Sequence, residues 1–155
     1  MNYQEKLQFL LKKFPEHLRS IDPQATPQWG KMNPQQMVEH MNDSVQQALV
    51  KVQPPVVTPA DRLEKMREFL MSEKEFRPNT NNPIMPEKPV PCRLPAIEDA
   101  ISQVESSLSE FVRYYGENPS ATAVNPLFGE MNYEQWIQLL HKHSIHHLKQ
   151  FSVAV

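Results

Sequence analysis

Two histidines near the end of the chain, His143 and His147, have the spacing of a metal-binding pair. They lie four residues apart, so on a helix their rings are stacked about one turn from each other. On a wheel that turns about 100° per residue, both fall within roughly 60° of Trp136, at the centre of an apolar stripe. This spacing presents two imidazole nitrogens to a single ion. The pair therefore predicts a divalent metal site on a buried helix face.

A bundle whose histidines only form hydrogen bonds is the alternative interpretation of the same pair. Each buried ring brings two nitrogens that must be satisfied away from water. Buried polar groups usually find a partner across the core, and a carbonyl or another side chain would be enough. A third imidazole from a different helix would favour the metal over this alternative.

His40 is the candidate for that third ligand. It lies at the edge of the apolar face of a segment that begins at Asn33, close to Ser44. At 1.5 Å per residue, His40 is about 10 Å beyond its helix start, and His143 and His147 are roughly 16 and 22 Å beyond theirs. In antiparallel helices about 30 Å long these levels coincide, whereas in parallel helices they differ by several ångströms. We therefore expect the two helices to be antiparallel.

Four segments carry apolar residues at helical spacing, approximately residues 3–18, 33–52, 95–115 and 132–151. The second and fourth open with the same pattern, aromatic-Gly-x-Met-Asn-x-x-Gln-apolar, at residues 29–37 and 128–136. An asparagine followed three residues later by glutamine is typical of a capping box. We expect both helices to begin with a packed aromatic side chain, a glycine bend and a capped first turn.

Residues 54–94 are rich in proline and separate the second helical segment from the third. Within them, residues 61–71 could form a short helix, and residues 74–94 have the composition of an extended crossover. A long crossover allows two consecutive helices to run in the same direction. The sequence thus predicts one all-α domain over residues 1–155, an up-down-down-up four-helix bundle. The small number of glycines, 3, weighs against tight β-hairpins.

The composition argues against several classes of partner. The chain has 16 Lys+Arg and 18 Asp+Glu, a net charge of -2, and no basic patch for nucleic acid or a membrane surface. No stretch approaches transmembrane length, and the first residues lack the apolar core of a signal peptide. The single cysteine, Cys92, cannot form an internal disulfide, which favours a reducing compartment. We expect a cytoplasmic protein.

The sequence resembles the DinB-like superfamily, whose members are often described as metal-dependent hydrolases. The resemblance rests on the helix of His40, on the run His143-x-x-x-His147-x-x-Gln150, and on the long crossover. The segment 142–151, preceded by Phe128-Gly129, is similar to one branch of that superfamily. The resemblance implies that one histidine of the second helix and two of the fourth bind a divalent ion, roles that map onto His40, His143 and His147.

A site with three imidazole ligands keeps at least one coordination position open, which is typical of catalytic rather than structural zinc. Zn²⁺ is the first expectation and Ni²⁺ the second, because imidazole suits both ions. Such an ion lowers the pKa of a bound water or binds a thiolate. Relatives of both kinds exist, so the resemblance implies an enzyme that acts on a small molecule by hydrolysis or by transfer of a low-molecular-weight thiol.

Other assignments stay open. The alternative to an enzyme is a non-catalytic bundle that binds a metal or a small ligand in its core. Gln150, His146 and Ser44 are candidates for contacts with the ligands or the substrate, and the sequence identifies no proton-transfer residue. The wheel turns Glu39 and Asp43, which flank His40, towards solvent. Relatives of this shape often pair through a helix face, so a homodimer is a further expectation.

Overall fold

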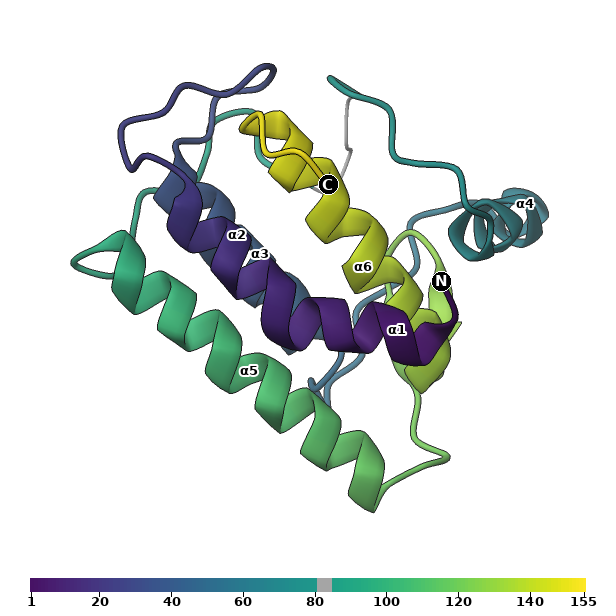
Figure 1. Ribbon diagram of the computed structural model, residues 1–155. Coiled ribbons are helices and arrows are strands. Elements are labelled where there is room, and N and C mark those ends of the chain that lie inside the picture. Colours follow the sequence, from purple (N-terminus) through teal and green to yellow (C-terminus); the bar gives the residue numbers. More distant parts are fainter. Residues whose placement is uncertain (81–84) are drawn as a thin grey trace.

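The structure, a computed structural model, describes residues 1–80 and 85–155 and is mostly helical (Figure 1). This confirms the helical class that the sequence predicts. The helices are α1 (Tyr3–Gln8), α2 (Phe14–Ser20), α3 (Pro34–Gln47), α4 (Ala60–Met71), α5 (Ile97–Glu117) and α6 (Tyr133–Gln150), with a π-helical turn, η1 (Phe9–Lys13), between α1 and α2. Two short strands, β1 (Ala123–Asn125) and β2 (Gly129–Met131), precede α6.

The first helical segment is continuous from α1 to α2 but widens at η1, just before Pro15. Proline has no backbone N–H, and its ring would clash with the carbonyl group four residues earlier. In the widened turn the N–H of Phe14 bonds to the carbonyl oxygen of Phe9, five residues back. The π-turn lets the helix pass the proline while Leu10, Phe14 and Leu18 stay buried.

α3 and α6 begin with the same arrangement, as the repeated sequence pattern predicts. The side chain of Asn33 accepts the N–H of Gln36, and the side chain of Gln36 accepts the N–H of Asn33, at 2.8 and 2.9 Å. Asn132 and Gln135 repeat this capping box at 3.0 and 2.9 Å. The glycines three residues before the two caps have φ angles of +76° and +79°, a region that costs other residues strain.

Hydrogen bonds between helices show which ones lie side by side. Ser107 of α5 donates to Asn42 of α3 at 2.6 Å, and Tyr115 of α5 donates to the carbonyl oxygen of Ala48 at 2.8 Å. Residue numbers rise together along this pair, so α3 and α5 run in the same direction. The core between the helices contains large buried side chains, among them Met37, Met41, Val104, Leu108, Phe111, Trp136 and Leu140.

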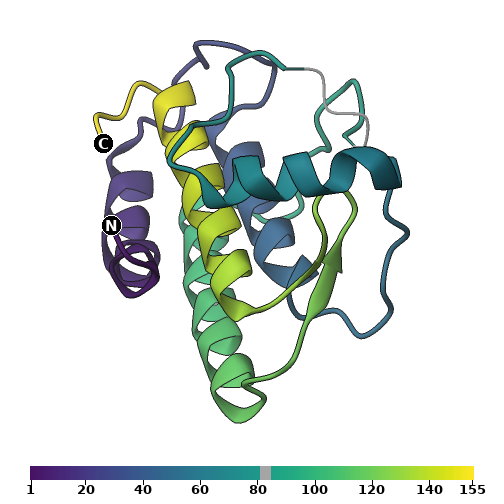
Figure 2. The same cartoon turned by 90° about the vertical axis from the view of Figure 1, so that its right-hand side faces the viewer.

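α3 and α6 run in opposite directions. Ahead of α3, the N–H of Gln28 donates to the carbonyl oxygen of Gln150 at the end of α6, at 2.7 Å. At the other end, Gln47 accepts from Asn125, in the hairpin that precedes α6, at 3.4 Å. In Figure 2, α4, within the crossover, lies on the viewer's side of the bundle, crosswise to α6, which it contacts.

The hairpin of β1 and β2 is a departure from the all-α prediction. The strands pair antiparallel, with Ala123 opposite Met131 and Asn125 opposite Gly129. The side-chain oxygen of Asn125 accepts the backbone N–H groups of the two residues that follow Pro126, at 2.8 and 3.1 Å, and so closes the turn. Scarcity of glycine was the wrong criterion, because one asparagine and one well-placed glycine are sufficient for this turn.

The crossover matches its prediction more closely than the end of α3 does. α4 occupies the residues expected to form a short helix, while residues 74–80 and 85–94 contain no helix or strand, and residues 81–84 lie outside the described residues. α3 ends at Gln47 rather than near residue 52, and Val52 is 87% exposed.

Among the described residues, no helix is both long enough and apolar enough to cross a membrane.

Replacement of Asn33 by alanine tests the shared helix start. We expect Asn33→Ala to lower the free energy of unfolding by about 1 kcal/mol, because the N–H of Gln36 loses its acceptor. Asn33→Asp keeps that acceptor and should be nearly neutral. Urea denaturation of both variants measures the effect. Equal losses in the two variants would show that the side-chain acceptor is not what stabilises the start of α3.

Candidate metal centre

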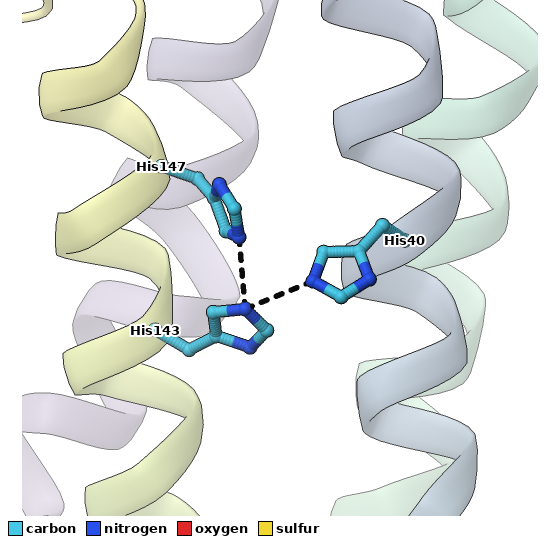
Figure 3. Close-up of side chains that lie close together, drawn as sticks. All are labelled: His40, His143 and His147. Atoms are coloured by element: carbon cyan, nitrogen blue, oxygen red, sulfur yellow. Dashed lines mark hydrogen bonds between the residues drawn. The ribbon is translucent and has the colours of Figure 1, made fainter. Parts of the chain in front are cut away.

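Three histidine rings from two helices meet inside the bundle (Figure 3). His40 belongs to α3, and His143 and His147 belong to α6. The Nε2 atom of His143 lies 3.0 Å from Nε2 of His40 and 2.8 Å from Nε2 of His147. One nitrogen of each ring lies within 4.8 Å of the other two. The structure thus brings together the three histidines that the sequence selected.

The helix faces and their relative direction produce this convergence. His143 and His147 lie on the buried side of α6, one turn apart, next to the fully buried Leu140. His40 lies on the side of α3 that faces them, as Figure 3 shows. Because α3 and α6 are antiparallel, His40 reaches the level of the other two rings. His147 is 5% exposed, and the other two rings are partly buried.

Hydrogen bonding alone does not account for the position of His143. In a neutral imidazole, each nitrogen either carries one proton to donate or holds one lone pair that accepts. Nε2 of His143 has two ring nitrogens within hydrogen-bond distance, at 3.0 and 2.8 Å. Nε2 of His143 can form one good hydrogen bond with these two nitrogens. The second contact then lacks a proton with which to form another hydrogen bond. A cation between the rings would use all three lone pairs.

Electrostatics keep the three rings neutral. Burial lowers the pKa of His40, and it lowers the pKa of His143 and His147 well below the usual histidine value. His40 further lowers the pKa of His143 and His147, and His147 lowers that of His143. The neighbouring His146 lowers the pKa of all three rings, whereas Asp43 raises that of His40 and the hydrogen bond to Gln150 raises that of His147. Neutral imidazoles are the form that binds metal ions. The donor set therefore fits a divalent ion.

The spacing of the nitrogens also fits. Tetrahedral zinc with Zn–N bonds of 2.0–2.1 Å separates its nitrogen ligands by about 3.3 Å. The distances of 2.8 and 3.0 Å at His143 differ from that value by a few tenths of an ångström. All three nitrogens lie within 4.8 Å of one another, so the cluster is close to the size of a three-histidine zinc site.

Gln150 contacts the cluster from the end of α6. Its Oε1 atom lies 2.7 Å from Nδ1 of His147, the nitrogen that faces away from the other two rings. Its Nε2 atom donates to the carbonyl oxygen of Trp29 at 2.9 Å. The side chain is 3% exposed. Gln150 therefore connects His147 to the loop that precedes α3.

His146 and Ser44 lie beside the cluster rather than in it. The ring of His146 lies 5.0 Å from that of His147, and it packs between Trp29 and Phe76 at 5.2 and 5.9 Å, centroid to centroid. The hydroxyl of Ser44 donates to the backbone carbonyl of its own helix, at residue 40, over 3.1 Å. That bond is to the backbone and not to the ring of His40.

The crossover contributes residues that the sequence analysis missed. The ring of Phe76, which follows α4, lies 6.2 Å from that of His143, centroid to centroid. The segment around it is anchored to α6, because Lys142 donates to the carbonyl oxygens of Ser72, at 2.9 Å, and of Lys74. An isolated phenylalanine in an irregular segment carries no periodic signal, so no sequence pattern could have placed it there.

The acidic neighbours of His40 are engaged by the same crossover. Glu39 is 4% exposed and accepts both the backbone N–H and the guanidinium of Arg93, at 2.8 and 3.2 Å. Burial alone raises the pKa of Glu39, but these hydrogen bonds and one from Gln35 lower it overall. Asp43 pairs with Arg93 at 2.9 Å. The expectation that Glu39 faces solvent is wrong, because the loop before α5 covers this side of α3.

Comparison with known proteins identifies one family. A family model described as the DinB superfamily matches residues 7–151, a range that contains all three histidines and Gln150. Among curated proteins and solved structures, none matches the chain.

Stability in the presence of a chelator tests the competition for Nε2 of His143. We expect His143→Leu to leave the free energy of unfolding unchanged or to raise it, because that nitrogen cannot satisfy both neighbours. His147→Leu should lower it by about 1–3 kcal/mol, because Oε1 of the buried Gln150 loses its partner. Chemical denaturation with excess chelator measures both. A larger loss in His143→Leu than in His147→Leu would contradict this account.

Proposed function

The chain belongs to the DinB superfamily, and on this basis we propose that His40, His143 and His147 bind one divalent metal ion, Zn²⁺ in the first place and Ni²⁺ in the second. We propose further that the protein is a metal-dependent enzyme that acts on a small molecule. The observation that carries this proposal is the shared nitrogen of His143, which lies within 3.0 Å of nitrogens from two other rings. Hydrogen bonds account poorly for that arrangement, and a cation accounts for it well.

The ligand set supports a reactive site rather than a structural one. Three imidazoles leave at least one position for water or substrate, whereas structural zinc is normally closed by four protein ligands. When bound, the ion supplies Lewis acidity, which lowers the pKa of a water or thiol that binds beside the histidines. The chain contributes three neutral nitrogens held by two packed helices and a buried amide, that of Gln150, that orients His147.

The helix order that the site requires is part of the proposal. Residue numbers rise together along the hydrogen bonds that join α5 to α3 and its C-cap. By contrast, the loop before α3 bonds to the end of α6, and the end of α3 bonds to the hairpin before α6. Lys6 of α1 bonds to Gln138 of α6, and Arg19 of α2 pairs with Glu98 at the start of α5. These contacts support an up-down-down-up bundle within a single domain over residues 1–155. A cytoplasmic location, a homodimer and the lack of nucleic-acid or membrane partners stay predictions.

The reaction is hydrolysis or transfer of a low-molecular-weight thiol, and a non-catalytic metal-binding bundle is the second candidate. One observation favours the second candidate. Both carboxylates that flank His40, on Glu39 and Asp43, are occupied by Arg93, so neither is free to move a proton. A thiol or a water whose pKa is lowered at the site needs little help from the chain to lose its proton. A poor leaving group would need a residue of the chain to donate a proton to it.

Metal content tests the proposed site directly. We expect purified protein to contain close to one divalent ion per chain by elemental analysis. Added Zn²⁺ at 100 times its Kd should raise the free energy of unfolding by about 2.7 kcal/mol. His40→Ala and His143→Ala should abolish this gain. The matched control is His141→Ala, on the same helix but outside the cluster, which should retain it. Metal content at background, or equal binding in the cluster variants, would refute the site.

Turnover distinguishes the enzyme from the binding module. We expect the zinc- or nickel-loaded protein to convert at least one class of substrate among esters, amides and thiol–electrophile pairs. The activity should disappear in His143→Ala, because that variant lacks the shared ligand, and should persist in His141→Ala. Inactivity of the fully loaded protein across all three classes would support the non-catalytic candidate.

A further inference from the structure

The end of α6 is joined to the loop before α3 through one buried amide, that of Gln150. We propose that Gln150 is a positioning residue that fixes which nitrogen of His147 faces the cluster with its lone pair, and that the loop from Gln28 to Gly30 holds this amide in place. This inference rests on the proposed metal site, because it assigns a role towards the same ion.

The orientation of the amide follows from its partner in the loop. The carbonyl oxygen of Trp29 can only accept a hydrogen bond, so the end of the amide that lies 2.9 Å from it must be the NH₂ group. The amide oxygen is then the atom that lies 2.7 Å from Nδ1 of His147. An oxygen acceptor requires a proton on Nδ1.

When the proton of the neutral ring is on Nδ1, the Nε2 atom carries a free lone pair. That lone pair is on the nitrogen that lies 2.8 Å from His143, within the cluster. A hydrogen bond from the far side of a histidine ring to an acceptor both fixes the tautomer and holds the ring plane. Gln150 therefore prepares His147 as a ligand before any ion arrives.

The loop is shaped to keep the amide there. The N–H of Gln28 donates to the backbone carbonyl of Gln150 at 2.7 Å. Gly30 has a φ of +76°, and a Cβ atom at this position would lie 3.1 Å from the amide nitrogen of Gln150. A larger residue would strain the backbone and press on the amide, so glycine permits the close approach.

Two glutamines on α6 provide a matched experiment. Gln150→Met keeps the length of the side chain but removes the acceptor. Gln138→Met makes the same change at another buried glutamine, 7% exposed, which bonds to the carbonyl oxygens of Leu70 and Ser72 rather than to a histidine. Gln150→Glu restores an oxygen acceptor for His147, although an ionised carboxylate has no donor for the carbonyl oxygen of Trp29. Nitrogen-15 NMR of the metal-free proteins reports the tautomer of His147, and competition with a chelator reports Zn²⁺ affinity.

We expect His147 of the wild-type protein to carry its proton on Nδ1. Gln150→Met should lose this preference and bind Zn²⁺ about 10–100-fold more weakly, Gln138→Met should keep both properties, and Gln150→Glu should recover the tautomer. A proton on Nε2 in the wild-type protein, or equal weakening in the two methionine variants, would overturn the inference. If the wild-type protein binds no ion, the proposed function fails, and the NMR result still decides the role of Gln150.

The two glycines with positive φ angles, Gly30 and Gly129, test the contribution of the loop. Gly30→Ala should weaken Zn²⁺ binding and disturb the tautomer of His147, because its Cβ presses on the amide. Gly129→Ala is the control, since Gly129 has a φ of +79° and its added Cβ would meet Arg67 and Leu63 instead. Equal effects of the two changes on Zn²⁺ affinity would show that general strain, and not the contact with Gln150, is responsible.

Discussion

A neutral imidazole nitrogen has one bonding direction, and at Nε2 of His143 two other ring nitrogens compete for it. Burial lowers the pKa of His143. Protonation of its ring is therefore an unfavourable way to end this competition. Folded proteins rarely leave such a conflict in place without a functional reason. The packing around the rings holds the three nitrogens close together, and the proposed cation would remove the competition between them.

The level at which the rings meet is set locally. Gln28 bonds to the backbone of Gln150 and Trp29 bonds to its side chain, and Gln150 lies about one turn after His147. The capped start of α3 follows the same loop, with His40 two turns further on. The start of α3 and the end of α6 are therefore fixed to one another within a few residues of the cluster. Errors that would accumulate along two whole helices do not affect the alignment of the three rings.

The part of the site that the sequence predicted is the part that helical geometry controls. The turn between His143 and His147, the rise to His40 and the position of Gln150 on the same face all follow from 3.6 residues per turn. The repeated asparagine–glutamine capping boxes marked the first residues of α3 and α6, and the distances along the two helix axes were counted from these residues. The covering residues could not be predicted in this way, because Phe76 and Arg93 belong to irregular segments whose positions depend on tertiary contacts.

The hairpin before α6 was missed for a related reason. Its turn depends on the side chain of Asn125 and the backbone of Gly129 acting together, a combination that counts of glycine do not reveal. The end of α3 was extended too far because Val52 continues the apolar spacing, although it is exposed beyond the last turn. Periodicity identifies the face of a helix better than it identifies the residue at which packing stops.

His146 and His147 show how the fold chooses between two adjacent candidates. Consecutive residues on a helix are separated by about 100°, so only one of the two rings can face His40. His147 has an acceptor for its outer nitrogen in Gln150, whereas His146 is packed between the rings of Trp29 and Phe76. Trp29 contributes to the placement of both histidines. Its carbonyl oxygen orients Gln150, which bonds to His147, and its indole ring packs against the ring of His146. The loop before α3 thus prepares one histidine for the cluster and holds its neighbour outside it.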